Sequence, residues 1–214
     1  MINRHFSDGE DSAVASRRTG GPVRRRILRR TALAALALVG VFAIDRLGVF
    51  GAGGDDFTRY DNHAFRVVKH VDGDTFDVDI PDPHRHKRTT RLRLWGVDTP
   101  ETVKPGAKID HFGPEASLFT DEQTTGKIVR LHLLARHTRD KYGRLLVYVD
   151  LPDGQMLNRV LVERGYAYAD PRFGHPYQRE FATLMNQARH NRRGLWADYQ
   201  EADLPEYLRE RGVR

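Results

Sequence analysis

The segment LWGVDTPE, residues 94–101, places Asp98 and Glu101 directly after a hydrophobic run. Two carboxylates this close repel each other, and a simple turn needs neither of them, so the pair indicates a cationic partner. That partner is either a metal ion or arginine side chains. Asp74 comes just after a turn that begins at Asp72, where a strand end is placed to face Asp98 across a sheet. A pair of carboxylates with a main-chain carbonyl and waters suits a hard cation such as Ca²⁺, although the spacing does not match an EF-hand loop.

Two arginines lie at fixed positions near these acids. Arg93 is in the middle of a strand pattern, five residues before Asp98, and Arg144 begins another strand pattern after a Tyr-Gly pair. Guanidinium groups donate paired hydrogen bonds to phosphate oxygens. A cation, arginines and a free carboxylate together suit phosphodiester cleavage, because the positive charges neutralise charge on phosphorus while the carboxylate activates water.

The charge of the chain is concentrated at its amino-terminal end. The 214 residues carry a formal net charge of +6, and residues 1–46 hold nine Arg against four acidic residues, which leaves residues 47–214 nearly neutral. A polyanionic substrate must therefore be argued from where the charges lie. The absence of cysteine excludes disulfides, thiolate metal sites and cysteine nucleophiles. His84 and His86 have no evident third ligand and are read as loop residues.

The amino-terminal region predicts a membrane-directed segment. Residues 1–30 are polar and basic and are predicted to be disordered. Residues 31–50 contain an uninterrupted apolar run of about 14 residues, which suits a signal peptide or, if extended, a signal anchor. The arginines before it predict that its amino end stays cytoplasmic. The rest would be exported, either membrane-anchored or secreted after cleavage, and residues 51–63 would form a linker.

Residues 64–198 read as one domain of short strands and helices. Strands are predicted at 64–71, 76–80, 91–97, 127–134 and 144–151, and helices at 113–126, 155–165 and 177–194. Five short strands with helices at one end predict a small closed barrel. Asp77 and Asp79 alternate with apolar residues and are assigned to a solvent-facing strand edge. Residues 199–214 are predicted to be a charged tail without a function.

Six ordered motifs carry a family resemblance: VDGDTFDV, RLRLWGVDTPET, FGPEAS, RDKYGRLLVYV, DGQMLNRVLVERGYA and RRGLW. Over residues 65–197 the chain resembles the staphylococcal nuclease (thermonuclease) family. The resemblance implies a β-rich α+β fold, an OB-fold five-stranded β-barrel with three helices. It also implies a Ca²⁺-dependent phosphodiesterase that hydrolyses DNA and RNA to products with 3′-phosphate and 5′-hydroxyl ends.

The resemblance also implies the role of each site residue. By matching positions, the Ca²⁺ ligands are Asp74, Asp98 and the Thr99 carbonyl, the catalytic residues are Arg93, Glu101 and Arg144, and the substrate contacts are Lys141 and Tyr142. The resemblance leaves two roles open for Glu101: a general base, or a residue that orders the attacking water. Residues 102–112 correspond to a mobile loop. The chain departs from the family at residues 170–177, where a base-stacking aromatic pair is not matched. Base preference is therefore not carried over.

A different function class remains open. Some members of this fold have lost the acids and arginines and act only as binding modules. Here the full set is present, which favours the enzyme over a non-catalytic or weakly nicking nucleic-acid-binding module tethered to a membrane. The expected partners are DNA, RNA and, through the amino-terminal segment, a membrane, and the expected oligomeric state is a monomer.

Overall fold

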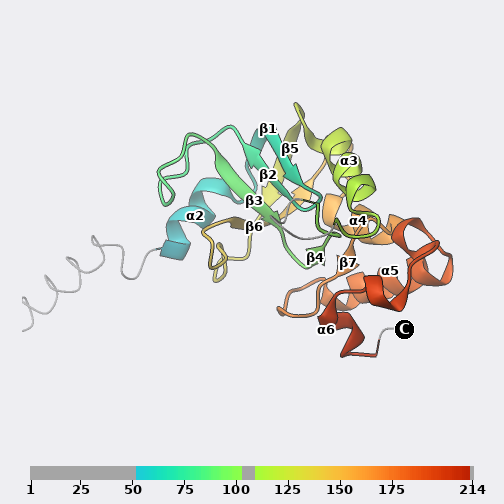
Figure 1. The fold of residues 1–214 in the computed structure, drawn as a ribbon. Coiled ribbons are helices and arrows are strands. Elements are labelled where there is room, and N and C mark those ends of the chain that lie inside the picture. The colour runs from blue at the N-terminus through green and yellow to red at the C-terminus, as the bar shows by residue number, and fades with distance from the viewer. Residues whose placement is uncertain (1–51, 103–108, 213–214) are drawn as a thin grey trace, which may run out of the picture. The chain divides into compact units, whose positions relative to one another are not determined.

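The computed structural model describes residues 52–102 and 109–212, and Figure 1 shows how their elements are arranged. The predicted basic segment 1–30 and the membrane-directed segment 31–50 lie outside these residues and stay predictions. None of the helices in the described part is both long enough and apolar enough to cross a bilayer.

Five strands close into a barrel in the order β1-β2-β3-β6-β5. All neighbouring pairs are antiparallel except β3 with β6, which are parallel. Alternate residues point inward, as expected for strands with one buried face, and Phe76, Leu92 and Leu131 are fully buried. The strands are β1 (Ala64–Asp72), β2 (Thr75–Val78), β3 (Thr90–Leu94), β5 (Ile128–His132) and β6 (Leu145–Asp150). The predicted OB-fold barrel is confirmed.

The three predicted helices are present. They are α3 (Gly113–Thr124), α4 (Leu157–Arg164) and α5 (Gln178–His190), followed by the short 3₁₀ helices η1 (Gly194–Trp196) and η2 (Glu201–Asp203). Helix α4 ends at Gly165, whose φ of 76° requires glycine. A Cβ there would also lie 2.2 Å from the Arg193 carbonyl oxygen, so this glycine fixes how α4 meets the chain that follows α5.

A second, two-stranded sheet branches from the barrel next to β3. Strand β4 (Val97–Asp98) pairs antiparallel with β7 (Tyr168–Ala169). The sequence predicted one strand through residue 97, but Gly96 adopts a φ of 74° and ends that strand. The break matters because it directs Asp98 out of the barrel and beside Tyr168.

The predicted linker at 51–63 is instead largely helical. Helix α2 (Ala52–Tyr60) packs on the barrel, and both Asp56 and Tyr60 are fully buried. Arg139 donates from Nε to Asp56 at 2.7 Å and from Nη1 to Asp82 at 2.9 Å. The Gly-rich composition suggested a flexible connection, but these contacts with distant residues stabilise a helix there.

The predicted tail is also part of the domain. Residues 199–212 contain η2 and helix α6 (Glu206–Arg209), which is labelled in Figure 1. The side chains of Leu204 and Leu208 are buried in the core. One strand residue also differs from expectation. Asp77 is buried and accepts hydrogen bonds from Arg91, whereas Asp79 is exposed as predicted.

Candidate functional site

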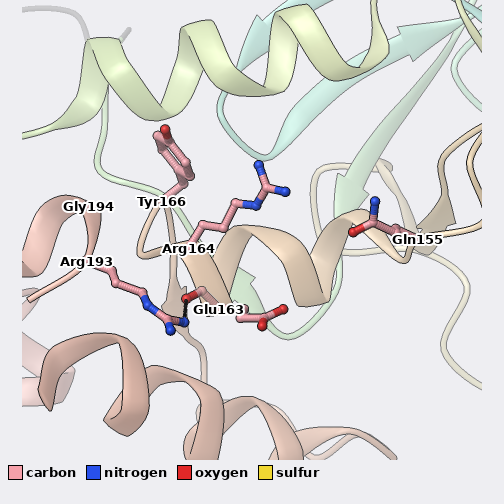
Figure 2. Close-up of a pocket in the computed structure, with 6 residues that line it drawn as sticks. All are labelled: Gln155, Glu163, Arg164, Tyr166, Arg193 and Gly194. Carbon is pink, nitrogen blue, oxygen red and sulfur yellow. Dashed lines mark hydrogen bonds between the residues drawn. The ribbon is translucent and has the colours of Figure 1, made fainter. Parts of the chain in front are cut away.

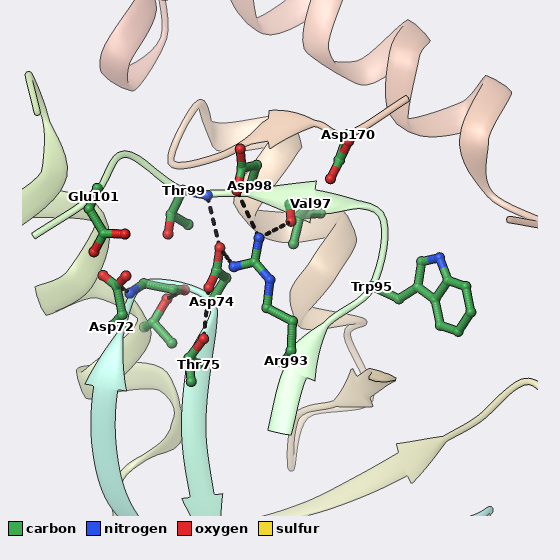
Figure 3. Close-up of polar contacts among 12 residues, drawn as sticks. Asp72, Asp74, Thr75, Arg93, Trp95, Val97, Asp98, Thr99, Glu101 and Asp170 are labelled. Atoms are coloured by element: carbon green, nitrogen blue, oxygen red, sulfur yellow. Dashed lines mark hydrogen bonds and ion pairs between the residues drawn. The ribbon is translucent and has the colours of Figure 1, made fainter. Parts of the chain in front are cut away.

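Arg93 lies between Asp74 and Asp98, as Figure 3 shows. Its Nη2 donates to Asp98 Oδ1 at 2.8 Å, and its Nη1 forms a close ion pair with Asp74 Oδ2. Strand pairing explains the arrangement. Thr75 of β2 pairs with Arg93 of β3, so the residue before Thr75 lies beside the guanidinium, and the turn into β4 brings Asp98 to its other side.

Asp74 is a buried carboxylate with a full set of donors. Its side chain is 3% exposed, and it accepts hydrogen bonds from Thr75 Oγ1 at 2.9 Å and from the Thr99 backbone N–H at 3.1 Å. Burial lowers the pKa of Arg93, while the charge of Asp98 opposes that shift. The carboxylates and the guanidinium therefore stabilise each other in a site that excludes most water.

Arg144 brings a second guanidinium to the same place. Its Nε donates to Asp140 at 2.7 Å, and its Nη1 lies 3.4 Å from Thr75 Oγ1. The positive charge of Arg144 also lowers the pKa of Arg93, which reflects their proximity. Two guanidinium groups therefore lie close together, and part of the Arg144 side chain is exposed. Guanidinium groups can donate paired hydrogen bonds to phosphate oxygens.

Lys141 and Tyr142 lie in the turn that precedes Arg144. The Lys141 ammonium is 5.0 Å from the centre of the Tyr142 ring, and the Arg144 guanidinium carbon is 5.5 Å from it. The Tyr142 side chain is largely exposed. The structure thus places both predicted substrate-contact residues beside the second arginine.

Glu101 lies beside Asp72 (Figure 3), a residue that sequence reasoning treated as a simple turn residue. Burial, followed by the charge of Glu101, raises the pKa of Asp72 to about 6, although hydrogen bonds from the Gly73 N–H and the Thr102 hydroxyl oppose the shift. The two carboxyl groups are therefore close enough to repel each other when both are charged.

Asp72→Asn is expected to stabilise the protein at neutral and higher pH. A carboxyl whose pKa is raised on folding binds more protons in the folded state, so the free energy of unfolding decreases as the pH rises from 3.8 to about 6. Asparagine keeps the Oδ1 atom that accepts both hydrogen bonds and removes the charge. The melting temperature in a chelator should rise by about 2–4 °C at pH 8, the shift that roughly 1 kcal/mol produces.

The same substitution should change little at pH 4, where Asp72 is protonated in the folded protein. Asp79→Asn, at an exposed strand position, is the matched control and should leave the melting temperature unchanged. Equal melting temperatures for Asp72→Asn and the parent at pH 8 would show that the Asp72 charge is not destabilising.

The predicted ligand side chains, Asp74 and Asp98, carry the oxygen donors that a hard cation prefers. Asp74 and Asp98 supply carboxylate oxygens, and the buried Thr99 Oγ1 has no hydrogen-bond partner among the described residues. Gly73 permits the close approach of Thr99, because a Cβ on Gly73 would lie 2.7 Å from Thr99 Oγ1. Over 52–102 and 109–212, no group of three or more His, Cys, Asp or Glu side chains is placed to hold a metal. A cation there would need oxygen donors beyond the carboxylates, such as backbone carbonyls and water.

Sequence reasoning missed two residues that contact Asp98. Arg172 Nη2 and the Tyr207 hydroxyl each lie 3.0 Å from Asp98 Oδ2. Burial and the charge of Asp98 raise the pKa of Tyr207, so its phenol remains an O–H donor. The four-residue spacing of the apolar Leu204 and Leu208 is the sequence feature that indicates a docked helical turn near Tyr207.

A separate open pocket of about 510 Å³ involves different residues (Figure 2). It is lined by Gln155, Glu163, Arg164, Tyr166, Arg193 and Gly194. The Arg193 side chain donates to the Glu163 carbonyl at 3.2 Å across this pocket. None of the lining residues belongs to the carboxylate and arginine site, so the pocket does not extend that site.

Comparisons with known proteins agree with this geometry. Residues 91–198 match the family described as Staphylococcal nuclease homologue. The chain is 32% identical over 167 residues to a thermonuclease of Staphylococcus hyicus, covering 78% of this chain and 94% of that protein. It is 40% identical over 125 residues to a thermonuclease of Staphylococcus intermedius, covering 58% of this chain and 68% of that protein.

A more distant bacterial relative points the same way. An uncharacterized endonuclease of Escherichia coli is 32% identical over 133 residues, which cover 62% of this chain and 76% of that protein. Three findings indicate the same family. The barrel has the expected topology, the matched region holds Arg93, Asp98 and Arg144, and the similarity to the first relative is nearly full-length. The chain therefore belongs to the staphylococcal nuclease family.

Proposed function

We propose that this protein is a Ca²⁺-dependent nuclease that hydrolyses phosphodiester bonds in DNA and RNA. One observation carries the proposal: Arg93 and Arg144 both lie close to the buried carboxylate of Asp74, at one end of the barrel. The similarity to two thermonucleases and to an endonuclease supports the same reaction class. Products with 3′-phosphate and 5′-hydroxyl ends are part of the proposal.

Each residue has a distinct task in this mechanism. Arg93 and Arg144 bind the scissile phosphate and stabilise the negative charge that grows on its oxygens in the transition state. Because burial excludes water and the arginines are already held by carboxylates, little reorganisation is needed when the phosphate arrives. Lys141 and Tyr142, beside Arg144, bind the neighbouring phosphate and sugar.

Asp74, Asp98 and the Thr99 carbonyl would hold the Ca²⁺. When bound, the ion supplies further positive charge against the phosphate and helps to orient the substrate. Glu101, which lies beside Asp72, accepts a proton from the attacking water or orders that water. In this proposal the leaving oxygen takes up a proton from solvent.

The test is DNA hydrolysis by the full chain with Ca²⁺ and with a chelator. The parent should cut only with Ca²⁺, and Glu101→Gln should lower the rate by about 10²–10⁴-fold, the usual size of a general-base effect. Glu122→Gln, an exposed residue on α3, is the matched control and should keep the parental rate. End-labelling of the products checks the 3′-phosphate.

The alternative is a binding module that does not cut. If the parent binds DNA but never hydrolyses it with Ca²⁺, the enzyme proposal fails and the arginine cluster is a phosphate-binding surface. Location is a separate proposal based on the apolar run at 31–44: the domain is exported, and is either membrane-anchored or released. Fractionation of cells and sequencing of the mature amino terminus would distinguish the two.

A further inference from the structure

Asp98 is held from outside the barrel as well as from within it. Its Oδ1 accepts from Arg93 at 2.8 Å, on the side that faces Asp74. Its Oδ2 accepts from two other donors, Arg172 Nη2 and the Tyr207 hydroxyl, each at 3.0 Å. The two carboxylate oxygens therefore have separate sets of partners: Oδ1 lies on the side of Arg93, which also pairs with Asp74, and Oδ2 lies on the side of Arg172 and Tyr207.

Both outer donors are themselves fixed. Asp170 is 7% exposed and accepts three hydrogen bonds from Arg172. The Arg172 backbone N–H donates at 2.9 Å, and its side-chain Nε and Nη2 each donate at 2.8 Å. The guanidinium of Arg172 also lies 4.1 Å from the centre of the Tyr207 ring, a cation–π contact. Strand β7 ends one residue before Asp170, so this group is carried on the same small sheet as Asp98.

Tyr207 is held by the segment that composition alone suggested was a tail. Leu204 and Leu208, on either side of Tyr207 in sequence, are 2% and 1% exposed and anchor α6 in the core. The family match ends at residue 198, so Tyr207 lies beyond the matched region. A freely moving surface tyrosine would gain little from a carboxylate contact, but an anchored one keeps its hydroxyl in place without further loss of side-chain entropy.

We propose that Tyr207 and Arg172 are positioning residues that orient Asp98 so that Oδ1 alone is presented to a divalent cation. The inference rests on the proposed Ca²⁺ site. Partners that hold the far side of a metal ligand reduce its rotational freedom and commonly change metal affinity by about 10–100-fold. The C-terminal segment 199–212 is then part of the metal centre and not only of the core.

The test measures Ca²⁺ binding directly. Tyr207→Phe removes one oxygen atom and keeps the packed ring, so calorimetric titration with Ca²⁺ should show about 10–100-fold weaker binding than in the parent. Tyr199→Phe is the matched control, since Tyr199 lies in the same segment but its ring packs on Trp196, and its Ca²⁺ affinity should equal that of the parent. Melting curves in a chelator check that each variant unfolds cooperatively.

Hydrolysis provides a second readout. If Tyr207 only positions Asp98, the rate of Tyr207→Phe at saturating Ca²⁺ should recover to within about threefold of the parent, because the reacting groups are intact. Arg172→Lys keeps the charge but loses the planar fork that spans Asp98 and Asp170, and it should weaken Ca²⁺ binding in the same way. This second variant also decides the question if Tyr207→Phe does not fold.

Unchanged or tighter Ca²⁺ binding in these variants would overturn the inference, and tighter binding would show that the outer donors hold Asp98 away from the ion. These results differ from failure of the proposed function, in which the parent itself neither binds Ca²⁺ nor cuts DNA. A parent that binds and cuts, beside a Tyr207→Phe variant that binds equally well, would remove only the positioning role.

Discussion

Arg144→Ala is expected to lower the rate of Ca²⁺-dependent DNA hydrolysis by about 10²–10³-fold, the cost of removing one donor that stabilises a growing negative charge. Arg144 is held by Asp140 and lies beside Thr75, which in turn donates to Asp74. Its guanidinium is already oriented before substrate binds. Removing it therefore takes away fixed positive charge at the phosphate, and initial rates at saturating DNA and Ca²⁺ measure that loss.

Two further variants separate this effect from loss of folding. Arg159→Ala removes an arginine of another ion pair, between α4 and Glu180, and should keep the parental rate. Arg144→Lys keeps the charge without the planar fork and should remain at least about tenfold slower than the parent. Ca²⁺ affinity should stay unchanged in Arg144→Ala, since Arg144 contacts none of the predicted ligands directly. A parental hydrolysis rate in Arg144→Ala would falsify the phosphate-binding role.

Arg139→Met is expected to destabilise the domain by about 3–5 kcal/mol, which is typical when one partner of a buried ion pair is removed. Arg139 is 12% exposed at its side chain, while Asp56 and Asp82 are 1% and 0% exposed. Methionine fills most of the same space but leaves two buried carboxylates without their cation. The melting temperature should fall by roughly 10 °C, measured by differential scanning calorimetry at pH 7 in a chelator.

The matched control is again an arginine ion pair, but an exposed one. Arg159→Met breaks the contact with Glu180, where both side chains are 39% exposed, and should cost at most about 1 kcal/mol. If Arg139→Met melts within 2–3 °C of the parent, α2 is not held through this ion-pair network. Arg139 also donates to the Gly143 carbonyl at 2.8 Å, so the variant should in addition loosen the turn that carries Arg144.

Local patterns were sufficient to predict the barrel. Strands β2 and β3 alternate apolar and polar residues, and β6 is a short apolar run. Helices α4 and α5 carry apolar stripes, and α4 is followed by a glycine cap. These are short-range properties that sequence displays directly. The structure brings Asp74, Arg93 and Arg144 close together, because they lie at the ends or in the middle of barrel strands that pair with one another.

The features that sequence reasoning missed depend on partners far along the chain. Arg139 and Asp56 are 83 residues apart, and Tyr207 and Asp98 are 109 apart. The partner of each contact cannot be read from its own segment, so a Gly-rich stretch suggested a linker and a charged stretch suggested a tail. Asp77 was assigned to the surface for the same reason, since its partner Arg91 lies on the neighbouring strand.

The parallel pairing of β3 with β6 has a consequence for when the protein becomes active. Arg93 on β3 pairs with Leu146 on β6, and more than fifty residues of chain separate the two. Asp74 and Arg93, in contrast, are brought together by β2 and β3, which are adjacent in sequence. Pairings over long stretches of chain form late because their loop-closure entropy must be overcome first. A chain that has formed only its early hairpins thus holds one of the two arginines proposed to bind phosphate, and the second arrives when the barrel closes. Hydrolysis by the proposed mechanism then requires the closed barrel.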